Sequence, residues 1–199
     1  MRIIFTVLAY LLGAFPTGYI IFKLSEKKDI RHFGSQSSGA TNIFRLKGLG
    51  FALPVVVIDV LKGFLPPFLA LKFLKDPLLA ALAAFAAVLG HCYPVYIKFK
   101  GGKGVATTFG AMAAFAGLPV GLGLAVFVLT VTLTRYVSLG SLLGTFSLPL
   151  FLWFYGRETS LIVLSLSAFC IILIRHQGNI RRLWKGTERK FGQKIRVEE

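Results

Sequence analysis

Residues 78–97 read LLAALAAFAAVLGHCYPVYI, a stretch without a single Asp, Glu, Lys or Arg. A helix needs about 20 consecutive apolar residues to cross the hydrocarbon core of a bilayer, so this stretch predicts a membrane span. The rest of the chain agrees, because it is 55% hydrophobic and only 16% charged, with a mean hydropathy of +0.73. That composition excludes a disordered chain and argues against a soluble domain, in which about 25% of residues are charged.

Further apolar runs lie on both sides of this stretch, separated by short polar loops. Together they predict an all-α membrane protein with about seven transmembrane helices: 1–23, 49–73, 78–97, 105–118, 119–133, 139–155 and 161–174. The run at 105–118 is short for a full crossing, so a short or re-entrant span is expected there. We expect residues 1–199 to form a single integral-membrane domain.

Basic residues are distributed unevenly around these runs. The chain carries 23 Lys and Arg against 8 Asp and Glu, a formal charge of +15. Most of the basic residues fall in loops 23–47 and 98–103, at Arg135 and in the tail 175–199, all on one predicted side. By the positive-inside rule that side is the cytoplasm, so the N-terminus lies outside, the C-terminus lies inside, and the first run is retained rather than cleaved. Because the charges occupy short loops between apolar runs, we expect no nucleic-acid partner.

The first cytoplasmic loop contains the sequence GSQSSGATNIFR at residues 34–45, and we call residues 34–39 the serine loop. Its small residues let the backbone bend and expose N–H groups, and its hydroxyl and amide side chains add hydrogen-bond donors. Arg45 adds a bidentate donor for phosphate. An ordinary flexible loop followed by a helix start has the same composition, so both interpretations remain open from composition alone.

The second loop ends in Gly101-Gly102-Lys103-Gly104, which we call the glycine loop, directly before an apolar helix. A glycine turn at a helix N-terminus leaves backbone N–H groups free, which makes an anion site, and Lys103 supplies a point charge. The loop is not a Walker A motif, because Gly104 stands where a Ser or Thr would hold magnesium. The alternative is a tight turn with a lysine that extends to the membrane surface.

The third polar segment begins at Arg175-His176-Gln177-Gly178-Asn179. His176 could act as a general base and Asn179 could position a hydroxyl or a phosphate, whereas the alternative is a basic segment that binds anionic lipid. Within the second apolar run, Asp59 and Lys62 lie three residues apart on one helix face and can pair. This pair is either structural or functional, since charges inside membrane spans tend to be functional.

Several chemistries lack the residues that they require. No carboxylate pair serves the polar loops, which argues against a glycosidase or an aspartic protease. None of the three histidines has an Asp five positions later, so the His–x4–Asp acyltransferase motif is absent. The two cysteines lack CxxC spacing and no His/Cys/Asp cluster suggests a metal, so we expect neither a metal nor another cofactor.

These loops closely resemble those of the bacterial acyl-phosphate:glycerol-3-phosphate acyltransferase family (PlsY). The resemblance rests on residues 38–45, 98–107 and 175–183, together with 59–63 and 135–141, in order and at the family spacing. The chain departs from the family in the serine loop, where Gln36-Ser37 replaces the usual Gly-Asn. The resemblance implies a multi-pass enzyme of the cell inner membrane. It would transfer a fatty acyl group from acyl phosphate to the sn-1 hydroxyl of glycerol 3-phosphate. The products would be lysophosphatidic acid and phosphate, and the reaction would be the first acylation of phospholipid synthesis.

The resemblance also suggests a role for each loop. Catalytic roles are expected for Arg45, Lys103, His176 and Asn179. Acyl phosphate is expected to contact Ser37, Ser38, Gly39, Thr41, Gly101, Gly102, Gly104 and Thr107. Glycerol 3-phosphate is expected to contact Ser35, Asn42, Arg45, Lys103, Ser141, His176 and Asn179. Either His176 or a substrate phosphate would accept the hydroxyl proton. The active site would face the cytoplasm, and the enzyme would act as a monomer within the lipid bilayer.

The rival interpretation is an organophosphate transporter, which can also contain broken helices, midplane charges and Gly-rich turns. Two observations argue against it: the polar loops gather on one predicted side, and no inverted repeat relates the two halves. A structural protein that binds anionic lipid would explain the basic tail but not the glycine loop.

Overall fold

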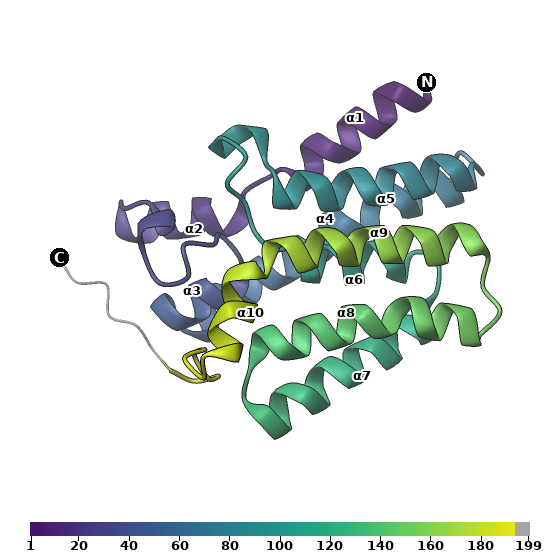
Figure 1. Cartoon of the computed structure of the whole chain (residues 1–199). Coiled ribbons are helices and arrows are strands. Elements are labelled where there is room, and N and C mark those ends of the chain that lie inside the picture. Colours follow the sequence, from purple (N-terminus) through teal and green to yellow (C-terminus); the bar gives the residue numbers. More distant parts are fainter. Residues whose placement is uncertain (194–199) are drawn as a thin grey trace.

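The computed structural model describes residues 1–193, and every regular element within them is a helix (Figure 1). The elements are α1 (Arg2–Gly13), α2 (Thr17–Glu26), η1 (Ile30–His32), α3 (Ala40–Lys47), α4 (Leu49–Lys72), α5 (Pro77–Cys92), η2 (Val95–Ile97), α6 (Val105–Ala113), α7 (Gly117–Thr134), α8 (Val137–Phe154), α9 (Thr159–Arg175) and α10 (Gln177–Trp184). The expected all-α fold is therefore confirmed for the described residues. Residues 194–199 of the expected domain and tail lie outside them.

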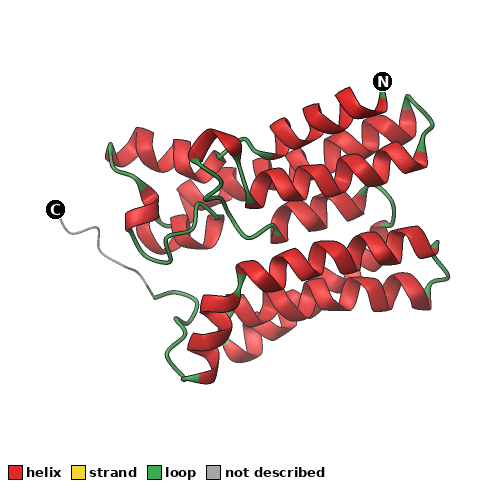
Figure 2. Ribbon diagram, turned by 45° about the horizontal axis from the view of Figure 1, so that its top comes forward, coloured by secondary structure: helices red, strands yellow, loops and turns green. Residues whose placement is uncertain are grey.

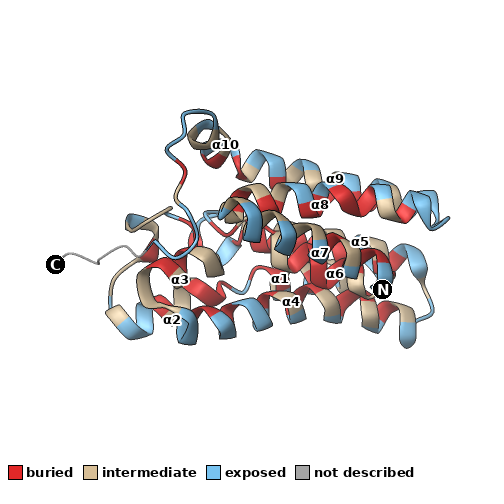
Figure 3. Cartoon of the chain, turned by 90° about the horizontal axis from the view of Figure 1, so that it is seen from below, coloured by how far each residue is buried: buried red, intermediate tan, exposed pale blue. Residues whose placement is uncertain are grey.

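The helices pack as two groups that share one core (Figure 2). One group contains α1, α4, α5 and α6, and the other contains α7, α8 and α9. Buried side chains of Val88, Phe109, Leu148 and Ala168, from α5, α6, α8 and α9, join the groups. Exposed residues line the outer helix faces (Figure 3), as expected for helices that would contact lipid there.

The contact between α4 and α6 is unusually close because two glycines face the opposite backbone. A Cβ at Gly63 would lie 2.1 Å from the carbonyl oxygen of Thr107, and one at Gly110 would lie 2.1 Å from that of Val60. Small residues at helix interfaces let membrane helices approach in this way. The short helix α6 is thereby fixed along α4, directly behind the cavity described below.

Five segments are long and apolar enough to cross a membrane, namely 2–26, 49–72, 77–97, 117–134 and 137–154. Helices α9 and α10 provide a sixth when taken together, although they are bent by 63°. The difference from the expected seven lies at 105–118, where α6 has nine residues. At 1.5 Å per residue such a helix is about 14 Å long, roughly half of a hydrocarbon core.

The first apolar run is also broken, where we expected one continuous helix. Helix α1 ends at Gly13, and α2 begins at Thr17 after Pro16. Proline lacks the N–H that a helix interior needs and disfavours helical geometry in the residue before it. The carbonyl of Phe15, released by this break, accepts a hydrogen bond of 2.9 Å from Lys62 Nζ on α4.

The polar loops gather at one end of the helices, which we call the site end. Helices α5 and α9 end there and α6 begins there, and Arg175, the last residue of α9, donates hydrogen bonds to the loop that precedes α6. The N-terminus lies at the opposite end (Figure 1), where Arg2 pairs with Asp76 at 2.6 Å before α5.

Candidate active site

A cavity of about 370 Å³ opens at the site end and brings together residues from the serine loop, the glycine loop and the α9–α10 bend. The part of the cavity next to the loops is polar. The part that lies between α4, α6 and α7 is apolar, and it is lined by Val56, Val60, Phe109, Ala113, Val120 and Leu124. One cavity therefore combines a polar end with an apolar channel inside the helix bundle. Within residues 1–193, no group of three His, Cys, Asp or Glu could hold a metal ion.

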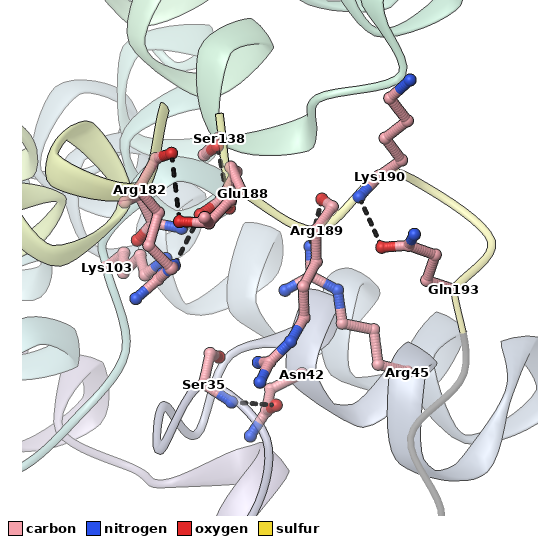
Figure 4. Close-up of polar contacts among 12 residues, drawn as sticks. Ser35, Asn42, Arg45, Lys103, Ser138, Arg182, Glu188, Arg189, Lys190 and Gln193 are labelled. Carbon is pink, nitrogen blue, oxygen red and sulfur yellow. Dashed lines mark hydrogen bonds and ion pairs between the residues drawn. The ribbon is translucent and has the colours of Figure 1, made fainter. Parts of the chain in front are cut away.

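The serine loop is shaped by one side chain, that of Asn42 in the first turn of α3. The Asn42 Oδ1 accepts the Ser35 N–H at 2.9 Å, while Nδ2 donates to the carbonyls of Phe33 and Ser37 at 3.1 and 2.9 Å. Figure 4 shows the contact between Asn42 and Ser35. Because both groups of the amide are used inside the loop, Asn42 holds the backbone that faces the cavity.

The glycine loop is held by Arg175, the last residue of α9. Arg175 Nε donates to the Gly102 carbonyl at 3.0 Å, and its NH2 group donates to the Gly101 carbonyl at 2.9 Å. The chain then turns at Gly104, where a φ of +86° requires glycine or strains any other residue. The next residues begin α6 and line the cavity, so its first unpaired N–H groups lie at the cavity wall.

The bend between α9 and α10 carries His176 and Asn179 into the cavity. The Nδ1 atom of His176 lies 2.8 Å from the Ile172 carbonyl. A carbonyl only accepts, so Nδ1 carries the proton, and Nε2 of the neutral ring is left as a proton acceptor. The Asn179 Oδ1 accepts from Lys103 Nζ at 2.6 Å, which joins this bend to the glycine loop.

The segment after α10 also enters the site, which the sequence analysis did not predict. Glu188 is buried and accepts hydrogen bonds from Asn179 Nδ2 at 2.7 Å, from Arg182 Nε at 2.7 Å and from Ser138 Oγ at 3.1 Å. Figure 4 shows this carboxylate between Ser138 and Arg182. The signal in the sequence was a lone acid within a basic segment, and no spacing rule would have tied it to Asn179.

Three further contacts hold this segment against α3 and the α7–α8 turn. The Arg45 guanidinium donates to the Arg189 carbonyl at 3.1 Å, and the rings of Phe44 and Phe191 stack with centroids 5.0 Å apart. The Phe191 N–H donates to the Arg135 carbonyl at 2.6 Å. The segment thus covers the side of the cavity that lies near Arg45.

Burial sets the ionisation of the charged groups at the polar end. It lowers the pKa of Lys103 to about 8, an effect that Glu188 opposes and Arg45 reinforces. Burial also lowers the pKa of Arg45. Burial of Glu188 disfavours its charged form, but hydrogen bonds from Arg182 and Asn179 outweigh it and hold the Glu188 pKa below its usual range. Lys103 is therefore a cation that can lose its proton near neutral pH.

Most of the residues expected at the site line this one cavity. They are Ser35, Ser37, Gly39, Thr41, Asn42, Arg45, Lys103, Gly104, Ser141, His176 and Asn179. Four others do not line it: Ser38, Gly101, Gly102 and Thr107. The Gly101 and Gly102 carbonyls bind Arg175, and Thr107 is fully buried on the α4 side of α6, where its carbonyl touches Gly63. These residues shape the loop and the helix rather than the cavity wall.

Known proteins resemble this chain over most of its length. The family model described as "Glycerol-3-phosphate acyltransferase" matches residues 3–186. The chain belongs to this family. A glycerol-3-phosphate acyltransferase of Erwinia tasmaniensis is 43% identical over 186 residues, covering 94% of this chain and 90% of the relative. One of Photorhabdus laumondii is 40% identical over 193 residues, covering 97% and 88%.

Two crystal structures of PlsY (YgiH), an integral membrane glycerol 3-phosphate acyltransferase, have the same fold. The glycerol 3-phosphate form gives a TM-score of 0.92 at 38% identity, and the lysophosphatidic acid form gives 0.88 at 37%, each covering 96% of both chains. The resemblance stated from the loops is therefore confirmed. This acyltransferase is an integral membrane protein, and Glu188 lies just beyond the residues that the family model matches.

Proposed function

We propose that this acyltransferase transfers a fatty acyl group from acyl phosphate to the sn-1 hydroxyl of glycerol 3-phosphate, releasing lysophosphatidic acid and inorganic phosphate. The observation that carries the proposal is the shape of the cavity, in which a cationic end with two loops continues into an apolar channel. Both proposed substrates bring a phosphate, which suits the first part, and the donor brings an acyl chain, which suits the second.

The proposed chemistry needs no nucleophile from the protein, because acyl phosphate is an activated mixed anhydride. The hydroxyl oxygen of glycerol 3-phosphate attacks the acyl carbon, the bond from that carbon to the phosphate oxygen breaks, and phosphate leaves with the electron pair. The protein supplies position and charge stabilisation. The N–H groups at the start of α6, with Lys103, would hold the acyl phosphate and the oxyanion that forms.

Arg45, His176 and Asn179 would hold glycerol 3-phosphate. The displaced hydroxyl proton goes either to Nε2 of His176, which the bond from Nδ1 to Ile172 leaves unprotonated, or to an oxygen of a substrate phosphate. A His176→Gln variant separates the two. Near-normal turnover with an unchanged pH profile would exclude the histidine as base.

We further propose that the chain crosses the membrane seven times as one domain and one monomer, with its N-terminus outside and the site end in the cytoplasm. The opposite placement of the N-terminus and the site end supports an odd number of crossings. The seventh crossing would be the short run at 105–118, of which α6 forms the first nine residues. Basic loops at the site end support the cytoplasmic placement in an inner membrane.

The test is phosphate release by purified protein in detergent, with palmitoyl phosphate in the presence and absence of glycerol 3-phosphate. We expect release that depends on glycerol 3-phosphate, with lysophosphatidic acid formed in equal amount. A folded protein that forms neither product would contradict the proposed donor. The rival transporter needs a sealed compartment, so turnover in detergent also excludes transport as the whole activity.

A further inference from the structure

Four buried polar side chains meet below the two loops, and the proposed chemistry uses none of them. Asp59 Oδ1 lies 2.8 Å from Lys62 Nζ, accepts from Thr17 Oγ1 at 3.2 Å and lies 3.6 Å from His91 Nδ1. These side chains come from α4, α2 and α5, and all four are buried. We call Thr17, Asp59, Lys62 and His91 the polar platform.

His91 connects the polar platform to the glycine loop. Its carbonyl accepts the Gly102 N–H at 3.1 Å, and its ring lies directly against Gly102. A Cβ at Gly102 would lie only 2.0 Å from Nε2 of His91. The glycine loop therefore packs directly against the His91 imidazole.

Thr17 and Lys62 connect the polar platform to the serine loop. Lys62 holds the Phe15 carbonyl at the α1–α2 break, and Thr17 begins α2 while bonded to Asp59. The next residue, Gly18, contacts the serine loop so closely that a Cβ there would lie 2.0 Å from the Ser38 carbonyl oxygen. The start of α2 is thus fixed to α4 on one side and supports the serine loop on the other.

An ion pair inside membrane helices is costly, and well-packed apolar residues can replace a buried pair without loss of stability. Stability alone therefore does not explain this one. We propose that the polar platform is a positioning element that sets both loops at the spacing needed to bind the phosphate groups of the two substrates. The proposal deepens the proposed function, because it rests on the two loops as the substrate phosphate sites.

The first test is a double-mutant cycle between the loop and its support. We expect Gly102→Ala to lower kcat/KM at least tenfold, because the new methyl group collides with the His91 ring. His91→Ala removes the colliding atoms, so the double variant should be more active than Gly102→Ala alone. Gly121→Ala is the matched control, since nothing lies within 4 Å of its Cβ, and it should behave as the wild type. If the decreases in kcat/KM of the two single variants simply multiply in the double variant, the proposed contact is wrong.

The second test separates positioning from stability. A variant carrying both Asp59→Leu and Lys62→Met should still fold, with a lower Tm because the Phe15 carbonyl and the Thr17 hydroxyl lose their partners, while its KM for glycerol 3-phosphate and for palmitoyl phosphate rises at least tenfold and kcat changes less. Asp76→Asn is the control, because it changes the same residue type at the opposite end of the bundle. A folded double variant with unchanged KM values would refute the proposal. If this variant does not fold, the double-mutant cycle of Gly102 and His91 still tests the contact between the polar platform and the glycine loop.

A third measurement tests the polar platform independently of the proposal that acyl phosphate is the acyl donor. The rise in Tm that glycerol 3-phosphate produces can be measured without any acyl donor. We expect a smaller rise for the Asp59→Leu, Lys62→Met variant than for the wild type at the same concentration. If the wild type shows no turnover with palmitoyl phosphate, the donor is wrong, and this binding comparison still tests the polar platform. An equal rise in both proteins would count against it.

Discussion

The serine loop and the glycine loop face the same cavity but are held in different ways. The serine loop is organised from within, because Asn42 bonds the backbone of three residues that lie no more than nine positions away. The glycine loop is organised from outside. Its carbonyls are held by Arg175, more than 70 positions along the chain, and it rests on the ring of His91.

This difference determines what each loop depends on. The internal shape of the serine loop depends on the local chain and the start of α3, so it should survive small movements between helices, whereas its position also depends on the contact between Gly18 of α2 and Ser38. The glycine loop can take its shape only after α5, α6 and α9 have packed together. Substitutions that loosen helix packing should therefore reduce activity through the glycine loop first. The following predictions test that contrast, beginning with the largest effect.

Arg175→Ala should have the largest effect on the glycine loop. It removes two hydrogen bonds from a charged donor, worth about 1.5–3 kcal/mol each, or about 10²–10⁴-fold in kcat/KM if both are lost at the transition state. Steady-state kinetics with both substrates measure the loss. Arg157→Ala, at an exposed turn at the opposite end, is the matched control and should retain activity. A loss below tenfold would show that the loop keeps its shape without Arg175.

The same contrast shows what the sequence alone could provide. The apolar runs predicted the helices because a segment that crosses a bilayer must satisfy its backbone hydrogen bonds within itself. Eleven of the residues that line the cavity were identified through local motifs. Two features could not be predicted in this way: the hydrogen bonds from Arg175 to residues 101 and 102, and the position of Glu188 in the site. Both depend on which helix ends lie together in the fold, and no local sequence pattern encodes that.

Two differences between the apolar runs and the observed helices have local causes that the sequence did contain. Pro16 lies within the first apolar run, and a proline there predicts a break that the hydropathy average conceals. The run at 105–118 carries no charge, but residues 114–116 separate it into α6 and the start of α7. The length of this apolar run therefore overestimated the length of the helix that it forms, since α6 has only nine residues.

Asn42→Ala should be the next largest loss, and it should be confined to the serine loop. Three neutral hydrogen bonds of about 1 kcal/mol each correspond to about 100-fold in kcat/KM if the loop must order on binding. The Tm should fall little, because the rest of the helix packing is untouched. Ser25→Ala removes a hydrogen bond to the Phe22 carbonyl at the end of α2 and is a suitable control. A wild-type KM for both substrates would show that the loop is not organised by Asn42.

The charge of Lys103 should give the glycine loop a dependence on pH. Its pKa of about 8 means that the ammonium is present below pH 8 and is lost as the pH rises above it. We expect kcat/KM to fall about tenfold per pH unit above 8, because this ratio reports ionisation of the free enzyme. The effect on kcat should be weaker, since bound phosphate favours the charged form. Lys103→Arg, if active, should remove this fall in kcat/KM above pH 8. A wild-type kcat/KM that stays constant up to pH 10 would contradict the assignment of the fall to Lys103.

Glu188→Gln should have the smallest effect on rate at neutral pH and the most specific signature. Gln can still accept from Asn179 and Ser138, so only the charged contact with Arg182 is lost, and we expect less than a tenfold decrease in kcat/KM. The negative charge of Glu188 raises the pKa of Lys103, so removing it should move the alkaline limb of the pH profile below the wild-type position. A structural role alone would lower activity equally at every pH. An unshifted limb would therefore show that Glu188 acts on Asn179 and Arg182 without tuning the charge of the glycine loop.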